Sequence, residues 1–221
     1  MLTLPAEFSI QQVFLSMDKS VFNSEFQQKS LTSKIVVGLE RISEVFKVLL
    51  WEHAKVIGLS PIQIQILIFI TYHKSELCNV SHLAREFNIT KPTISDAIRV
   101  LDKKKFIIKD YSLSDSRSYS ILLSDLGRKT VAETENFANP IETQLKKNEA
   151  ADLENVFETL SKLIYQLQSN GILTVQRTCF GCKFYDKSEI RNYCNLMEKE
   201  LLTSDIRLDC PEYEEKPEGN N

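Results

Sequence analysis

Four of the five cysteines lie in the last fifth of this 221-residue chain. Cys179 and Cys182 form a C-x-x-C pair with Gly181 inside it, and Cys194 and Cys210 follow at wider spacing. A pair on a tight loop and two distant partners could together supply four thiolates to one tetrahedral metal site. In a cytosolic protein such a cluster is more typical of metal binding than of disulfide bonds. The four cysteines are therefore predicted metal ligands.

The spacing leaves the identity of the metal open. Zinc is the common occupant of a four-cysteine site with two separated halves, where its role is structural. An iron–sulfur cluster is the alternative, because Cys210 precedes Pro211 as in some cluster-binding runs. Reactive thiols without a metal are a third possibility. The segment is too short for a core of its own, so a metal would supply folding energy. Apolar spacing predicts a short helix over 189–202.

A second group of candidate residues lies between residues 80 and 101, VSHLAREFNITKPTISDAIRVL. Ile94, Ile98 and Leu101 fall on one face of a predicted helix, and Thr90 is placed to cap it. The opposite face carries side chains that donate or accept hydrogen bonds: Lys91, Thr93, Ser95, Asp96 and Arg99. One packing face and one polar face are what a recognition helix in a DNA major groove requires.

Charge is unevenly distributed along the chain, whose net charge is −3. From Arg85 to Arg117 there are eight basic and five acidic residues, whereas from Arg177 onward there are seven basic and ten acidic. A locally basic centre suits double-stranded DNA even when the total is negative. No apolar run is long enough to span a membrane, and the N-terminus lacks the basic region of a secretory signal. We therefore expect a cytoplasmic protein without a membrane partner.

Apolar spacing and helix signals predict the elements that position these residues. Residues 34–57 are predicted to form one long helix, which Gly58 ends. Ser60 and Pro61 are typical of a helix start, and the next helix is predicted over 60–73. Isoleucine at every second position of that segment is also typical of a strand, but the length and the start signal favour a helix. His82, on the helix before the polar face, is interpreted as a surface residue.

A β-hairpin and two helices are predicted after the recognition helix. Residues 106–108 and 119–123 are the predicted strands, joined by a polar loop. A helix over 125–145 must kink or break near Pro140, because proline removes an internal hydrogen bond. The final helix is predicted over 149–168, with apolar residues along one face. The hairpin directly after a recognition helix is the wing of a winged helix.

This order of elements, with the blocks LAREFNITKPTISDAIRVLDKKKFI and DSRSYSILLSDLG, resembles the MarR family of bacterial winged-helix transcription regulators over residues 34–170. The resemblance implies a mainly α fold with a small β-wing, a winged helix-turn-helix core and long dimerisation helices. It implies a homodimer whose recognition helices enter successive major grooves of a pseudopalindromic operator, usually as a repressor. The positions that match the family's DNA contacts are Lys91, Pro92, Thr93, Ser95, Arg99, Asp115 and Arg117.

Three segments follow from these patterns: an N-terminal helical extension over 1–33 that includes a helix from Ser9, a MarR-like domain over 34–170, and a four-cysteine tail over 171–221. The predicted function is DNA-binding transcription regulation, modulated by a small-molecule effector or by the state of the cysteine site. The alternative is a winged-helix protein–protein adaptor with a structural zinc tail. The sequence has no phosphate-binding loop, dinucleotide glycine pattern or nucleophile–base set, so an enzyme is not expected.

Overall fold

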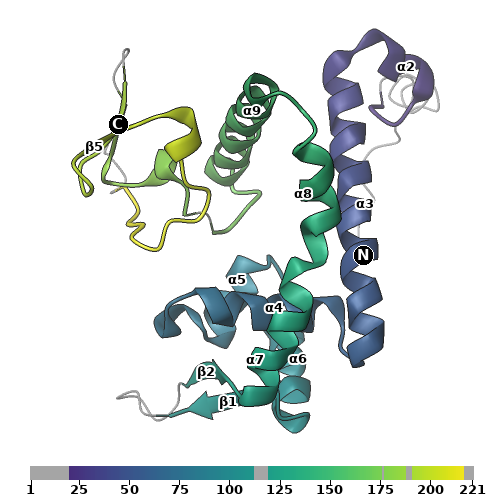
Figure 1. The fold of residues 1–221 in the computed structure, drawn as a ribbon, viewed down its shortest axis with the longest axis vertical. Coiled ribbons are helices and arrows are strands. Elements are labelled where there is room, and N and C mark those ends of the chain that lie inside the picture. The colour runs from purple at the N-terminus through teal and green to yellow at the C-terminus, as the bar shows by residue number, and fades with distance from the viewer. Residues whose placement is uncertain (1–19, 112–118, 176, 188–190, 217–221) are drawn as a thin grey trace, which may run out of the picture. The chain divides into compact units, whose positions relative to one another are not determined.

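The computed structural model (Figure 1) describes most of the chain, namely residues 20–111, 119–175, 177–187 and 191–216. The fold is mainly helical with small antiparallel sheets, as predicted. The chain divides into two compact units, residues 1–53 and 54–221. The helix predicted from Ser9 lies outside the described residues, and the predicted segment boundaries near residues 33 and 170 stay a prediction.

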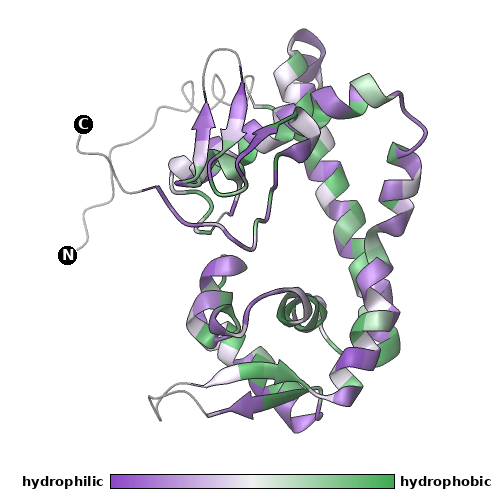
Figure 2. Ribbon diagram, turned by 60° about the vertical axis from the view of Figure 1, so that its left-hand side comes forward, coloured by the Kyte–Doolittle hydropathy of each residue, from purple (hydrophilic) through white to green (hydrophobic). Residues whose placement is uncertain are grey.

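The first unit contains α2 (Ser24–Lys29) and most of α3 (Leu31–Ile57). Asn23 caps α2, and its side-chain oxygen accepts a hydrogen bond from the backbone N–H of Glu25 at 2.9 Å. The long helix predicted over 34–57 is confirmed. In Figure 2, hydrophilic and hydrophobic residues are interspersed along the long helices. Several apolar side chains of α3 are exposed in the single chain: Leu31, Ile35, Val36, Leu39, Ile42, Val45, Val48 and Trp51.

In the part of the chain that the structure describes, membrane-spanning potential is limited to one pair of helices. Among the described residues, no single helix has both the length and the apolar character needed to cross a bilayer. The bent pair formed by α3 and α4 (Pro61–Tyr72) meets the length and composition requirements only when its two helices are taken together.

The core of the second unit is built around α4. The backbone N–H of Ser60 donates to Oε1 of Gln63 at 2.9 Å, and Pro61 occupies the first turn, where its missing N–H costs nothing. The prediction of a helix rather than a strand is therefore confirmed. Three of its side chains have no exposed surface: Ile64, Ile66 and Leu67. A helix that is apolar on all sides has to be enclosed by its neighbours.

The predicted helix-turn-helix is confirmed as α5 (Val80–Glu86) followed by α6 (Lys91–Lys103). Asn88 reverses the chain between them with a φ of 52°, a left-handed conformation that asparagine tolerates. Thr90 caps α6, because its side-chain oxygen accepts from the backbone N–H of Thr93 at 3.4 Å. The buried face of α6 consists of Ile94, Ala97, Ile98 and Leu101.

The predicted hairpin is confirmed as β1 (Ile107–Asp110) and β2 (Ser120–Leu123), an antiparallel pair. Ile107 lies opposite Leu123 in the register. Ile107, Ile121 and Leu123 are buried, so the hairpin closes the winged-helix core. The loop that joins the strands, residues 112–118, lies outside the described residues.

The helix predicted over 125–145 is divided, as expected from Pro140. It consists of α7 (Asp125–Thr134), a 3₁₀ turn, η2 (Glu135–Ala138), and α8 (Asn139–Leu145). Pro140 lies in the first turn of α8, where no internal hydrogen bond is lost. The final predicted helix is confirmed as α9 (Ala150–Ser169).

After α9 the chain forms small elements: η3 (Cys179–Gly181), β3 (Tyr185–Lys187), β4 (Asn192–Cys194), β5 (Lys199–Leu201) and η4 (Thr203–Asp205). The strands form one antiparallel sheet in the order β3-β4-β5. We call residues 177–216, without the undescribed 188–190, the cysteine module.

The short helix predicted over 189–202 is wrong. Cys194 pairs with Tyr185 on one side and with Lys199 on the other, and Glu198 turns the chain with a φ of 51°. Strands of three residues are too short to display a period-two pattern, so the apolar spacing of this segment mimicked that of a helix.

Candidate nucleic-acid interface and cysteine site

The polar face of α6 is exposed, while its opposite face is fixed in the winged-helix core. Each predicted DNA-contact residue on this helix lies at the surface: Lys91, Pro92, Thr93, Ser95 and Arg99. The helix therefore presents them together on one side. The other two predicted contacts, Asp115 and Arg117, lie outside the described residues, so their role stays a prediction.

An ion pair lies on this exposed face. Arg99 Nη2 is 2.6 Å from Asp96 Oδ1, and the two side chains are 75% and 69% exposed. Exposed pairs of this kind contribute little to stability. Arg99 can therefore exchange Asp96 for a phosphate or a base edge at small cost. The hydroxyls of Thr90 and Thr93 lie 2.8 Å apart at the start of the helix.

Part of the basic stretch after α6 has an internal role that the sequence did not indicate. Lys104 Nζ donates to the carbonyl of Gly58 at 2.5 Å. Lys109 Nζ lies 2.9 Å from Asp102 and 5.3 Å from the centre of the Tyr119 ring. These two lysines fasten the end of α6 and the start of the wing.

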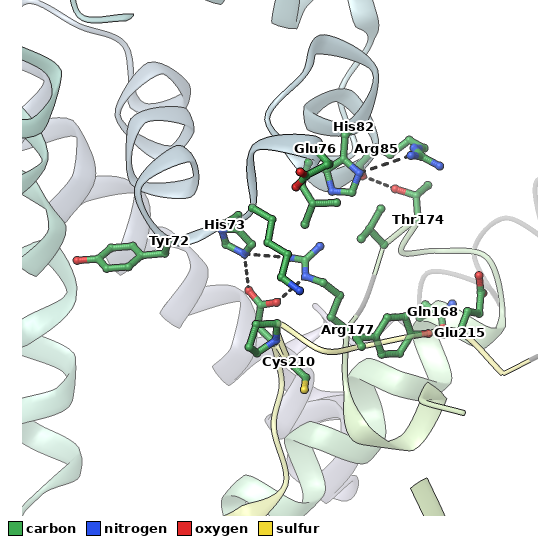
Figure 3. Close-up of a pocket in the computed structure, with 16 residues that line it drawn as sticks. Tyr72, His73, Glu76, His82, Arg85, Gln168, Thr174, Arg177, Cys210 and Glu215 are labelled. Carbon is green, nitrogen blue, oxygen red and sulfur yellow. Dashed lines mark hydrogen bonds and ion pairs between the residues drawn. The ribbon is translucent and has the colours of Figure 1, made fainter. Parts of the chain in front are cut away.

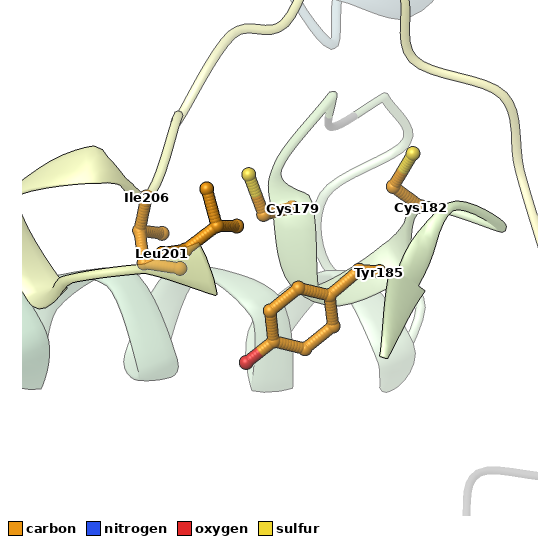
Figure 4. Packing of buried hydrophobic residues seen from close by; sticks show 5 residues of the cluster. All are labelled: Cys179, Cys182, Tyr185, Leu201 and Ile206. Carbon is orange, nitrogen blue, oxygen red and sulfur yellow. The ribbon is translucent and has the colours of Figure 1, made fainter. Parts of the chain in front are cut away.

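The four cysteines of the module line one small cavity of about 40 Å³. Cys179 and Cys182 are buried, and Figure 4 shows their sulfur atoms on the same side of the loop. They pack in a small hydrophobic cluster with Tyr185, Leu201 and Ile206. Cys194 and Cys210 are half-buried, and all four are without a disulfide bond.

The cysteines share this cavity without closing around a common point. Among the described residues, no group of three or more His, Cys, Asp or Glu side chains is arranged to hold a metal ion. The backbone N–H of Arg207 donates to Cys179 Sγ at 3.2 Å, and the Arg207 guanidinium lies 3.7 Å from Cys210 Sγ. Burial and the neighbouring cysteines raise the pKa of the Cys179 thiol despite that N–H. Arg207 was not predicted as part of this site.

A cavity of about 730 Å³ lies between the cysteine module and the winged helix, and its lining includes Arg177, Asp209 and His73 of an ionic cluster (Figure 3). We call this cluster the clamp; it consists of Arg177, Asp209, His73 and Glu86. Arg177 binds both carboxylate oxygens of Glu86, at 2.8 and 3.1 Å, and its Nε donates to Asp209 Oδ1 at 2.5 Å. Asp209 Oδ2 lies 2.8 Å from His73 Nε2. Sequence reasoning missed the clamp entirely.

Charge complementarity inside the clamp outweighs its burial. Burial is the largest influence on Asp209 and favours the neutral acid, but the contacts of Arg177 and His73 together place the pKa of Asp209 below its usual range. Burial likewise opposes the charge of Arg177, while Glu86 and Asp209 raise the pKa of its guanidinium. Both groups are therefore charged at neutral pH.

His82 is buried, so its interpretation as a surface residue is wrong. It lies on the side of α5 that faces Phe69, with ring centroids 6.0 Å apart, and its Nε2 is 3.6 Å from Glu86. Its Nε2 has no hydrogen-bond partner among the described residues. Burial lowers the pKa of His82, Glu86 opposes this, and nearby cations including Arg177 lower it further. The imidazole is therefore neutral at neutral pH.

This shift predicts that His82 makes the fold sensitive to acid. In the unfolded chain the imidazole takes up a proton near pH 6.5, while in the folded chain it does so only at lower pH. The contribution of His82 to the free energy of unfolding therefore has its full value above about pH 6.5 and decreases as the pH falls below this value. Urea unfolding at pH 7.5 and 5.5 should show a smaller loss in His82→Gln than in the unmodified chain. Equal losses in both proteins would contradict the prediction.

Comparison with known proteins gives one family match and several similar folds. Residues 57–118 match the model of the MarR family. The structure of MepR from S. aureus in complex with DNA is similar, with a TM-score of 0.53 and 23% identity, over 60% of this chain and 97% of that one. A MarR protein from Peptoclostridium difficile has a TM-score of 0.55 and 20% identity, over 64% of this chain and 92% of that one. A MarR/EmrR family regulator from Acinetobacter sp. ADP1 has a TM-score of 0.52 and 19% identity, over 63% of this chain and 99% of that one.

A comparison with curated proteins returns no match. About three-fifths of this chain covers nearly the whole length of each similar structure. The chain is therefore similar to the MarR family over residues 57–118 and has the fold of MarR-family winged-helix regulators.

Proposed function

We propose that this protein is a DNA-binding transcription regulator that acts as a homodimer on a pseudopalindromic operator, usually as a repressor. The observation that carries the proposal is the exposed polar face of α6, a helix whose opposite face is buried in the core of the helix-turn-helix. A helix of this kind fits the major groove, where Arg pairs with guanine and Thr and Ser contact phosphates or base edges. MepR, which shares the fold, has been solved in complex with DNA, and this supports the proposal.

The proposed dimer is supported by the apolar side chains that α3 exposes. Side chains such as Ile35, Leu39 and Ile42 recur at three- and four-residue spacing and are each more than a third exposed. An apolar stripe of this length is unusual on the surface of a monomer. A second copy would bury it, and a twofold dimer presents two recognition helices to two half-sites.

The signal that we propose for this regulator is a change at the cysteine module or a small molecule bound by the dimer. Cys179, Cys182, Cys194 and Cys210 would hold the metal, zinc or an iron–sulfur cluster, after their sulfur atoms draw together in the shared cavity. A cation would stabilise thiolates that burial otherwise disfavours. The cationic Arg207 beside Cys210 would offset the negative charge of a four-thiolate site.

DNA binding is tested by selecting sites from a random duplex library with the full-length protein. On the selected duplex, Arg99→Ala should weaken binding by about 1–3 kcal/mol, or about 5- to 150-fold. Arg128→Ala is the control on another helix, since Arg128 forms an exposed i,i+3 pair, 2.5 Å from Asp125, on α7 and also donates to the carbonyl of Leu123 at 2.8 Å. Lys91→Ala should reduce the slope of log K against log salt by about one if Lys91 binds a phosphate.

The outcomes of this experiment separate the proposal from its alternative. Failure to enrich any duplex, with the protein folded and dimeric, would contradict the proposal and favour a protein–protein adaptor. Equal losses in Arg99→Ala and Arg128→Ala would show that the polar face of α6 does not read DNA.

A further inference from the structure

The clamp contacts the winged helix at two residues, one at the end of α5 and one directly after α4. Glu86 is the last residue of α5, immediately before the turn that leads to α6. His73 follows the last residue of α4 and stacks on the ring of Phe69, with centroids 3.7 Å apart and planes 7° from parallel. Phe69 is itself part of the buried core. The clamp therefore reaches both the core helix and the junction that sets the direction of α6.

On its other side the clamp is directly linked to two of the cysteines. Asp209 is adjacent to Cys210, and Arg177 lies two residues before Cys179. The backbone N–H of Cys210 donates to the carbonyl of Arg177 at 3.0 Å, and that of Cys179 donates to the carbonyl of Arg207 at 3.1 Å. The segments that carry Arg177 and Asp209 are thus hydrogen-bonded side by side. A displacement of either cysteine moves the clamp residues with it.

The clamp is also stronger than the surface ion pairs around it. The side chains of Arg177 and Glu86 are only 11% and 18% exposed, and the guanidinium contacts both carboxylate oxygens. Loss of one partner would leave a poorly solvated charge without compensation. Lys74 and Glu212, by contrast, are both 56% exposed and 3.3 Å apart, which is a weak contact. The clamp is therefore the stronger of these two ionic contacts between the module and the winged helix.

We propose that the clamp couples the state of the cysteine module to the helix-turn-helix. While the module is intact, Arg177 and Asp209 hold Glu86 and His73 and thereby fix α5 and α6. A change at the cysteines that displaces these segments releases Glu86 and loosens both helices. Arg177 and Asp209 are positioning residues, which act on DNA only through α5 and α6. This proposal rests on the proposed function for its consequence on DNA, but not for the coupling itself.

The coupling is tested with a double-mutant cycle of Cys179→Ser and Arg177→Gln in the full chain. Amide hydrogen exchange of residues 80–103 is the readout, because it needs neither DNA nor a known metal. Cys179→Ser alone should speed exchange there about fivefold or more, and Arg177→Gln should do the same. In the Arg177→Gln background, Cys179→Ser should add nothing, because the connection is already cut. Equal effects of Cys179→Ser in both backgrounds would overturn the proposal, as would no effect in the unmodified chain.

Two controls separate coupling from general destabilisation. Lys183→Gln breaks an ion pair of the module, 2.5 Å from Glu214, that does not touch the winged helix. It should leave exchange over 80–103 unchanged, whereas Arg177→Lys should partly restore the unmodified rates. If Arg177→Gln does not fold by circular dichroism, Glu86→Gln cuts the clamp from the other side and replaces it in the cycle.

DNA affinity of the same four proteins gives the second readout. Cys179→Ser should weaken binding to the selected duplex about fivefold or more in the unmodified chain and not in the Arg177→Gln background. Coupled exchange without any DNA binding would refute the proposed function and leave the clamp standing. DNA binding with uncoupled exchange would refute the clamp and leave the proposed function standing.

Discussion

Replacing Gly127 by alanine is expected to lower the free energy of unfolding by about 3 kcal/mol, the upper part of the range for overpacked sites. Gly127 lies in the first turn of α7, and its N–H donates to the hydroxyl of Ser124, the capping residue, at 3.0 Å. A Cβ at this position would lie 2.1 Å from the carbonyl oxygen of Phe106 and 3.3 Å from Leu123 Cδ2. Because the closest atom belongs to the backbone, no side-chain rotation relieves the contact.

The clash would disturb the segment around Phe106, which connects the recognition helix α6 to the first strand of the wing. The Phe106 carbonyl also accepts a hydrogen bond from the backbone N–H of Ser124 at 3.1 Å, so its displacement would disturb the start of α7. Urea unfolding followed by circular dichroism measures the loss. Lys129→Ala, an exposed change on the same helix, should stay within about 0.5 kcal/mol. A loss below about 1 kcal/mol for Gly127→Ala would mean that the backbone yields at this point without strain.

The winged helix was predictable because its determinants are local. The residue type of Thr90 predicts the start of α6, and the spacing of Ile94 and Ile98 predicts its buried face. Pro140 predicts the break between α7 and α8, because proline cannot donate a hydrogen bond inside a helix. Each of these signals acts within one or two helical turns, so one sequence is enough to recognise it.

The clamp could not be predicted because its partners are distant along the chain. Arg177 meets Glu86 across 91 residues, and no periodicity or spacing relates the two positions. The burial of His82 has the same origin, since Phe69 and the clamp enclose a side of α5 that shows no apolar pattern. The sheet of the cysteine module was missed for a different reason, because its strands are shorter than the window in which alternation is visible.

Removing the metal that we propose for the cysteine module should unfold the module and leave the winged helix folded. The hydrophobic cluster of the module has five buried residues, and two of them are Cys179 and Cys182 themselves. Apart from these two cysteines, its buried apolar core consists of Tyr185, Leu201 and Ile206, with only partly buried side chains such as Phe180 and Phe157 packed against it. So small a core does not offset the conformational entropy of some forty residues, at about 1.5 kcal/mol each. A bound metal would therefore supply most of the folding free energy of the module.

The measurement begins with metal analysis and an absorption spectrum of protein purified without oxygen. About one zinc ion per chain and no visible band would indicate a structural site, whereas iron, sulfide and a brown colour that bleaches in air would indicate a cluster. Chelation should then expose residues 177–187 and 191–216 to trypsin while residues 61–111 and 119–145 stay protected. Cys182→Ser should have the same effect without a chelator.

Cys78 offers the matched control, because it is a cysteine outside the module. It is 1% exposed, and burial raises the pKa of its thiol to about 11, so it is protonated and has no open path to a metal. Cys78→Ala should therefore keep the metal content of the unmodified chain, although it creates a small void in the winged-helix core. Protein that contains no metal when purified without oxygen, and whose module resists trypsin equally with and without chelator, would exclude a metal-dependent module. The module would then have to be stabilised by the clamp, by its own small sheet and by the packing of its hydrophobic cluster against Phe157 of α9.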